Sequence, residues 1–354
     1  MMWEVKPSFI VSRQHPLLQR SGDRVMNISK RPLGVISLLA AGALLVTATS
    51  AQADTITVQS LLSDELKEQQ VFASTYVTAG AGSTINGGVL AGTYVTTGVG
   101  TTIHGRTAAG TATTFGAGSI VDGAVQSGTA TTLGASANVS GSIRSGTATT
   151  VGAGAIVESD DVEDGSQNST APLVANSQGE ILKAQKFMGL FGSGKQLVPG
   201  DIAADTTFTA DTYGISGLLT VAANTTITLD AQGQDSVFQF NVSNYLTFGE
   251  GATVRVINTT DAAGNAVSVS VIWNATGGYV TVGAGANIVG TILAKGHVST
   301  GAHSMLSGPG TTCSAGVYSA TSYISIGAVA TVGTGSSCSA PTVPPMSAIE
   351  VPKH

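Results

Sequence analysis

The adjoining segments GTATTFGAGSIVDGAVQS (residues 110–127) and GTATTLGASANVSGSIRS (residues 128–145) repeat one phrase with a period of 18 residues. The period extends in both directions, to STYVTAGAGSTINGGVLA from residue 74, GTYVTTGVGTTIHGRTAA from residue 92, and GTATTVGAGAIVES from residue 146. Five units in one register predict a stack of coils over 73–160, because a repeat of this size cannot bury its apolar face without neighbouring copies.

Three positions of the unit are mostly apolar: the sixth, the twelfth and the sixteenth, which hold Phe115, Val121 and Val125 in the third unit. We expect these side chains to point into a common core. Apolar or small residues recur every sixth position, so the unit resembles a coil of the hexapeptide-type β-helix, with three short faces. The composition agrees, because 46 glycines with few charged or aromatic residues suit short strands joined by tight turns.

The fifth position is threonine in every unit, namely Thr78, Thr96, Thr114, Thr132 and Thr150. It adjoins the inward sixth position, so strand alternation turns it outward, and coils about 4.8 Å apart would align its hydroxyls and methyls in a row. The third position beside it holds Tyr76 and Tyr94, and then Ala112, Ala130 and Ala148. The thirteenth position is mixed and charged, with Asn86, His104, Asp122, Ser140 and Glu158. β-Propensity and cross-strand threonine pairs account for the threonines but not for the absence of charge, so we predict a binding face.

The N-terminus carries an export signal. Lys30 and Arg31 precede an apolar run from Leu33 to Val46, and Ala51-Gln52-Ala53 has the small residues of a signal-peptidase site. The run is shorter than the ~20 residues that span a bilayer. We therefore predict that residues 1–53 are a signal-peptide region cleaved after Ala53, with Met26 as the true start, and that the secreted mature chain has no membrane span.

The chain has two cysteines, Cys313 and Cys338. In an exported protein they predict a disulfide, which would constrain the unfolded chain by roughly 3 kcal/mol; two free thiols are the alternative. Two cysteines without a nearby histidine are too few for a zinc site, so we expect no metal. The body of the chain has no cluster of lysine and arginine, which opposes binding to nucleic acid.

An acidic and polar linker is expected at 161–179, and its spacing lacks the order of a calcium-binding loop. A helix is predicted at 180–192, because Ile181, Ala184, Met188 and Phe191 share one face. We expect this helix to cover apolar surface of the solenoid; a membrane-surface helix is the rival interpretation, with only two lysines in its favour.

Strand-like segments return from Leu197. Four phrases are similar to signature stretches of the ice-binding-protein-like family: Val198-Pro199-Gly200, TITLDAQGQDSVFQF (226–240), SVIWNATGGYVTVGAGANIVGTILA (270–294) and Ser299-Thr300-Gly301-Ala302. The resemblance covers residues 197 to about 305. It implies an all-β, discontinuous β-solenoid over 193–338 with one helix packed alongside, which adsorbs to ice through a flat face. Thr281 and Ser325 are the candidates for that face in this half. Ser307 to Ser322 depart from the family pattern.

No set of residues predicts catalysis. His104 occurs in one unit only, His297 and His303 lack a serine or carboxylate at a suggestive offset, and Asp122 and Glu158 lie two coils apart. The Gly-x-Gly phrases precede strands rather than helix N-termini, so they do not predict a phosphate site. We expect no enzyme activity and no cofactor.

The sequence therefore predicts a secreted, monomeric ice-binding protein. A cell-surface adhesin or a structural solenoid that binds glycans is the alternative. Adhesion to sugars would favour aromatic platforms, and on the threonine face only Tyr76 and Tyr94 offer one. A filament would need uncapped coil ends, whereas residues 54–72 read as an N-terminal cap. Residues 339–354 form a proline-rich tail.

Overall fold

The computed structural model describes residues 62–63, 66, 68–159, 161–165, 170–190, 195–197, 200–309 and 315–334. The chain divides into two compact units, Met1–Ala51 and Gln52–His354, and every described residue belongs to the second. Cys313, Cys338 and the predicted cleavage site at Ala53 lie outside the described residues.

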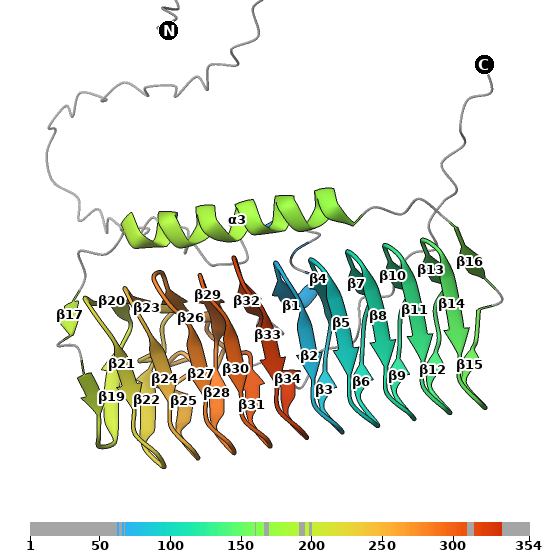
Figure 1. The fold of residues 1–354 in the computed structure, drawn as a ribbon. Helices are drawn as coiled ribbons and strands as arrows, with labels where there is room; N and C mark the ends of the chain where they lie inside the picture. The colour runs from blue at the N-terminus through green and yellow to red at the C-terminus, as the bar shows by residue number, and fades with distance from the viewer. Residues whose placement is uncertain are drawn as a thin grey trace, which may run out of the picture. The chain divides into compact units, whose positions relative to one another are not determined.

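The second unit is a β-solenoid in which three parallel sheets run along the stack of coils (Figure 1). The predicted class, an all-β discontinuous solenoid with one helix alongside, is confirmed. In spatial order, sheet A contains β16 (Val162–Asp164), β13 (Ile143–Ser145), β10 (Val125–Ser127), β7 (Thr107–Ala109), β4 (Gly88–Ala91), β1 (Gln69–Ala73), β32 (Val317–Ser319), β29 (Thr291–Ala294), β26 (Val269–Ala275), β23 (Ser236–Val242), β20 (Asp211–Ile215) and β17 (Lys195–Leu197).

Sheet B contains β14 (Ala148–Val151), β11 (Ala130–Leu133), β8 (Ala112–Phe115), β5 (Tyr94–Thr97), β2 (Val77–Ala79), β33 (Ile324–Ile326), β30 (Val298–Thr300), β27 (Val280–Val282), β24 (Leu246–Phe248), β21 (Leu219–Val221) and β18 (Gly200–Ile202). Sheet C contains β15 (Ile156–Val157), β12 (Asn138–Val139), β9 (Ile120–Val121), β6 (Thr102–Ile103), β3 (Thr84–Ile85), β34 (Thr331–Thr334), β31 (Met305–Ser307), β28 (Asn287–Val289), β25 (Thr253–Ile257), β22 (Thr226–Asp230) and β19 (Thr206–Thr209).

We call strands β1–β16 the N-half and strands β17–β34 the C-half. In the N-half, each residue pairs with the equivalent residue of the next unit, as Thr114 does with Thr132 and Val125 with Ile143. The positions predicted to point inward are buried; Leu133 and Phe115 are each 1% exposed. Val151 holds the same inward position but is 50% exposed, because it lies in the terminal coil, where no further coil covers it.

The order of the strands in space differs from their order in the chain. Strand β1 lies between β4 and β32, so the first coil of the N-half stacks on the last coil of the C-half. Leu62 and Leu66 are buried in a cluster with residues of helix α3. The segment expected to cap one end therefore lies at the middle of the stack, because its apolar residues are covered by the helix.

Helix α3 (Ala171–Leu190) lies along sheet A and covers part of both halves (Figure 1). Its Ile181, Ala184 and Met188 are buried against sheet A residues such as Leu293. The helix begins at residue 171 rather than 180, since Leu173 and Val174 extend its apolar contacts and a proline is tolerated in the first turn. Throughout the described ranges, no helix has the length and apolarity needed to cross a membrane.

The predicted linker at 161–179 is also partly wrong at its start, because Val162–Asp164 form strand β16. This strand pairs with β13, and Arg144 Nε lies 3.4 Å from Glu163 Oε2. An acidic segment can form an edge strand in this position because its charged side chains remain in solvent.

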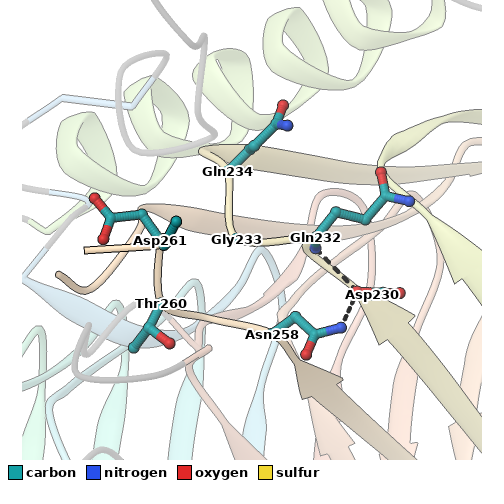
Figure 2. Close-up of a pocket in the computed structure, with 8 residues that line it drawn as sticks. Asp230, Gln232, Gly233, Gln234, Asn258, Thr260 and Asp261 are labelled. Carbon is teal, nitrogen blue, oxygen red and sulfur yellow. Dashed lines mark hydrogen bonds between the residues drawn. The ribbon is translucent and has the colours of Figure 1, made fainter. Parts of the chain in front are cut away.

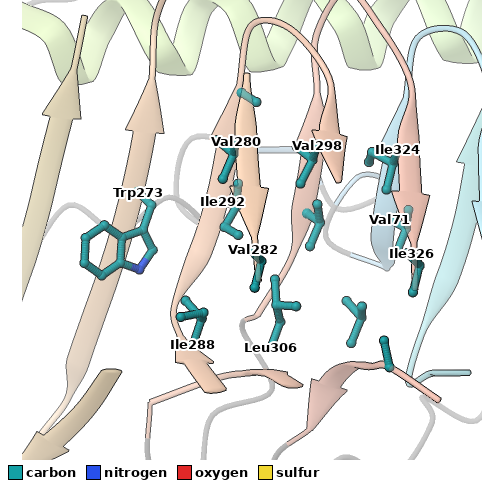
Figure 3. Close-up of a cluster of buried hydrophobic side chains, with 14 of the residues drawn as sticks. Val71, Trp273, Val280, Val282, Ile288, Ile292, Val298, Leu306, Ile324 and Ile326 are labelled. Atoms are coloured by element: carbon teal, nitrogen blue, oxygen red, sulfur yellow. The ribbon is translucent and has the colours of Figure 1, made fainter. Parts of the chain in front are cut away.

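The C-half is packed around aromatic rings. Trp273 stacks on Phe240 with centroids 4.3 Å apart, meets Phe248 edge to face, and donates a hydrogen bond from Nε1 to the Val289 carbonyl. Figure 3 shows that the core continues across the junction of the halves, where Val71 of β1 lies near Ile324 and Ile326. Tyr318 is buried under the helix and donates to the Gln69 carbonyl, and burial raises the pKa of its hydroxyl.

The turns from sheet B to sheet C have the same length in both halves. They contain four residues, as in 80–83 and 283–286, and the third residue has positive φ. The first residue is glycine in nearly all of them, because a Cβ there would meet the neighbouring coil; at Gly116 it would lie 2.4 Å from backbone atoms of Gly98. These turns hold adjacent coils in one register.

Candidate functional site

Sheet B carries one outward row of hydroxyl side chains that passes through both halves. Thr281 and Ser325, the candidates from the C-half, lie on the same sheet as the threonines of the N-half, and Ser325 pairs directly with Thr78. We call the ten threonine and serine residues the outer hydroxyl row. In spatial order it contains Thr220, Thr247, Thr281, Ser299, Ser325, Thr78, Thr96, Thr114, Thr132 and Thr150.

The outer hydroxyl row is accessible, and the face around it is almost without charge. Its ten residues are exposed or half-buried. Within the described strands of sheet B, Asp201 at the far end of the C-half is the only charged residue. Sheet A is partly covered by α3, and sheet C carries Arg255, Asp230 and the flanking charged residues of the N-half coils. Sheet B is therefore the neutral, uncovered face of the solenoid.

The column two residues before the row differs along the stack. In the last three coils of the N-half it holds the predicted residues Ala112, Ala130 and Ala148, which pair in register. In the rest of the stack it holds aromatic rings, stacked with centroids 4.4 to 4.9 Å apart. We call these five rings the ring ladder: Tyr245, Tyr279, His297, Tyr323 and Tyr76.

Sequence reasoning had placed only Tyr76 and Tyr94 on this face. The ladder continues across the junction, where Tyr323 stacks on Tyr76 with 1° between the ring planes. The available signal was an aromatic residue two positions before each threonine or serine of the row. It was missed because the coils of the C-half differ in length. Platforms for a second kind of ligand are thus more numerous than predicted.

The longer coils of the C-half leave sheet B unchanged because their extra residues lie between sheets C and A. Loops 231–235 and 258–268 both occupy this corner. Together they line a hollow of about 540 Å³ (Figure 2). Asp230 accepts hydrogen bonds from Gln232 N and Asn258 Nδ2, and Asp261 accepts from the Asn265 side chain, a bond that lowers the pKa of Asp261. These carboxylates organise the loops.

The histidines considered for catalysis have separate environments. His104 Nδ1 pairs with Asp122 of the adjacent coil on sheet C, an exposed contact. His297 belongs to the ring ladder, and His303 is exposed in a turn with φ of 58°. Among the described residues, no group of three or more histidine, cysteine, aspartate or glutamate side chains could hold a metal ion.

Comparison with known proteins gives one family. Residues 147–310 match the model of the ice-binding-like family. The match includes the last coil of the N-half, helix α3 and most of the C-half, whereas the first four coils lie outside it. No curated protein matches the chain.

Solved structures with a similar arrangement share little sequence with this chain. The ice-binding protein of the Antarctic ascomycete Antarctomyces psychrotrophicus is 14% identical with a TM-score of 0.44, over 75% of this chain and 94% of its own. That of an Arctic yeast is 14% identical with a TM-score of 0.46, over 75% and 90%. The domain of a Shewanella frigidimarina ice-binding protein is 18% identical with a TM-score of 0.46, over 77% and 96%. The resemblance inferred for residues 197 to about 305 is confirmed by the sequence match: residues 147–310 are a domain of the ice-binding-like family.

Proposed function

We propose that this chain is a secreted, non-enzymatic ice-binding protein that adsorbs to ice through sheet B. The observation that carries the proposal is the outer hydroxyl row, which continues in register from Thr220 to Thr150 through two halves of different sequence. Cross-strand pairing favours threonine in any parallel sheet. It does not explain a row that crosses the junction on the one face that is both uncovered and nearly uncharged.

The physical basis is the regular spacing of the row. Neighbouring strands in a sheet lie about 4.8 Å apart, so the row presents hydroxyl and methyl groups at a constant interval. Such an array can order water at its surface into a layer that matches an ice lattice. The stretch with Ala112, Ala130 and Ala148 supports the closest approach, because alanine does not rise above the neighbouring threonines, whereas a tyrosine ring does. We therefore place the principal ice contact on β8, β11 and β14.

Substitution on sheet B tests this assignment. Thr114→Tyr or Thr132→Tyr is expected to weaken inhibition of ice recrystallisation strongly by breaking the flat surface, with the thermal unfolding midpoint retained. Thr102→Tyr is the matched control, since Thr102 lies on sheet C of the same coils. Equal losses from both faces, or wild-type protein that leaves ice growth unchanged, would contradict the proposal.

The two halves can be separated in the same assay. If the C-half makes the principal contact, Thr281→Tyr or Ser325→Tyr will abolish the activity and the N-half variants will be silent. Our placement predicts the reverse order of effects. Measurement of crystal shape in parallel shows whether both halves approach the same ice plane.

Export and the disulfide belong to the same proposal. We expect the secreted protein to begin at Asp54 and to contain a Cys313–Cys338 bridge, as a monomer. N-terminal sequencing and thiol titration of secreted protein test the first two, and light scattering tests the third. A thiol count of two per chain would rule out the bridge.

Adhesion to glycans or to another surface is the second candidate, and the ring ladder favours it. Five stacked rings present their edges, and four of them are phenols that can donate hydrogen bonds. Retention on insoluble polysaccharides should then fall in Tyr279→Ala and Tyr323→Ala. If the wild type is retained but does not affect ice, adhesion is the better assignment.

A further inference from the structure

A chain of buried hydroxyl groups lies directly beneath the alanine–threonine patch of sheet B. Thr131 Oγ1 is 2.9 Å from Ser127 Oγ and 2.8 Å from Ser145 Oγ, and Thr113 Oγ1 is 2.8 Å from Ser127 Oγ. Thr149 continues the chain, 2.9 Å from Ser145, and donates to Asp164 Oδ1 at 2.7 Å. We call these six residues the buried hydroxyl chain.

The buried hydroxyl chain starts where the outer surface changes. In the first two coils the same inward positions hold Val77 and Val95 on sheet B, and Ala91 and Ala109 on sheet A. From the third coil they hold threonine and serine. The outer column changes from tyrosine to alanine at the same coil. Two changes, one inside and one outside, thus coincide on β8.

Stability alone does not account for the buried hydroxyls. Thr113, Thr131, Ser127 and Ser145 are 0% exposed. Replacing both members of a buried hydrogen-bonded pair by apolar groups of the same shape is close to neutral. The first two coils already use that apolar solution. What hydrogen bonds add is direction, because they tolerate only a narrow range of distance and angle.

The two devices act on the same corner of the coil. Where rings are present, stacking such as that of Tyr76 on Tyr323 fixes adjacent coils from outside. Where alanine replaces the rings, the only directional contacts at this corner come from inside. Thr113 and Thr131 are each flanked by outward residues of the patch, so fixing their side chains also fixes the strands that carry Thr114 and Thr132.

We propose that the buried hydroxyl chain consists of positioning residues for the ice-contacting patch. It holds β8, β11 and β14 at the spacing and orientation that the outer hydroxyl row needs, without touching ice. This inference rests on the proposed function.

The test is a pair of variants with opposite consequences. Thr113→Val/Ser127→Ala/Thr131→Val/Ser145→Ala copies the interior of the second coil; we expect an unchanged or raised unfolding midpoint and a severalfold loss of recrystallisation inhibition. Thr113→Ser/Thr131→Ser keeps the hydroxyls and loses two methyls; we expect a lower midpoint with the activity retained. Activity that follows stability in both variants would overturn the proposal.

A second measurement keeps the inference separate from the proposed function. Side-chain χ1 couplings of Thr114 and Thr132, measured by NMR without ice, should show single rotamers in the wild type and averaging in the apolar variant. If the wild type does not inhibit ice growth, the proposed function fails. Unchanged couplings in the apolar variant would refute positioning, whatever the wild type does to ice. Should the fourfold variant not fold, Thr113→Val/Ser127→Ala serves for both measurements.

Discussion

The two halves of the solenoid build one outer row on different interiors. In the N-half, Thr114 and Thr132 pair across 18 residues, and the core combines aliphatic side chains with buried hydroxyls. In the C-half, Thr247 and Thr281 pair although they are 34 residues apart, and the core is built from stacked rings around Trp273. The row is the same because the turn from sheet B to sheet C keeps its length, while additional residues lie at the corner of sheets C and A. The shape of a face thus depends on its flanking turns more than on the core beneath it.

The largest effect should come from charge placed inside the regular half. Leu133→Asp is expected to lower the free energy of unfolding by roughly 3–5 kcal/mol, because it buries an unpaired carboxylate. Thr132→Asp, one residue away and facing solvent, should cost little. Chemical denaturation of both variants measures the contrast, and similar losses would mean that inside and outside are assigned wrongly.

Truncation of the largest side chain compares the two cores directly. Trp273→Ala should cost about 3–5 kcal/mol, and Leu133→Ala about 2–5 kcal/mol. We expect the tryptophan variant to lose more, since it also leaves the Val289 carbonyl without its donor. Urea titration decides the order. A larger loss at Leu133 would show that the repeat half, not the ring-packed half, carries more of the stability.

Extending the aromatic column tests what the outer difference does. In Ala112→Tyr a ring would follow Tyr94 into the third coil, where stacking should add about 0.5–1.5 kcal/mol. Recrystallisation inhibition should fall nonetheless, because the ring rises above the patch. Ile120→Tyr on sheet C is the control for bulk alone. A variant as active as the wild type would show that the alanine column is not part of the contact.

The smallest effect concerns the turns that the halves share. Val329 and Gly82 occupy the same turn position in adjacent coils, with φ of 56° and 66°. A β-branched residue in this region is strained by about 1–2 kcal/mol. Val329→Gly should therefore raise the unfolding midpoint and Gly82→Val lower it, since a Cβ at Gly82 meets nothing closer than 3.6 Å. Calorimetry showing no opposition between the variants would contradict this explanation.

The sequence predicts the N-half in more detail than the C-half, for a physical reason. Equal coil length places equivalent residues at a fixed period, so Phe115 and Leu133 could be assigned inward and Thr114 and Thr132 outward from the letters alone. In the C-half, the loops vary in length, so Tyr245, Tyr279 and His297 share a column that no constant period detects.

Two further features depend on contacts that leave little local signal. The pairing of β1 with β32 joins residues such as Val71 and Val317, and either strand would suit another neighbour of similar shape. Helix α3 begins before its apolar face becomes regular, because its first turns pack with few large side chains.

The junction of β1 and β32 also constrains when the solenoid can be completed. Tyr318 donates to the carbonyl of Gln69, a contact between residues 249 positions apart. The N-half leaves the ribosome first, yet the open edge of its first coil has no partner until strands β32–β34 have been synthesised. Contacts of such long range form slowly, and an unpaired edge attracts other chains in the meantime. The nascent protein therefore depends on remaining unaggregated until its last coil closes the gap.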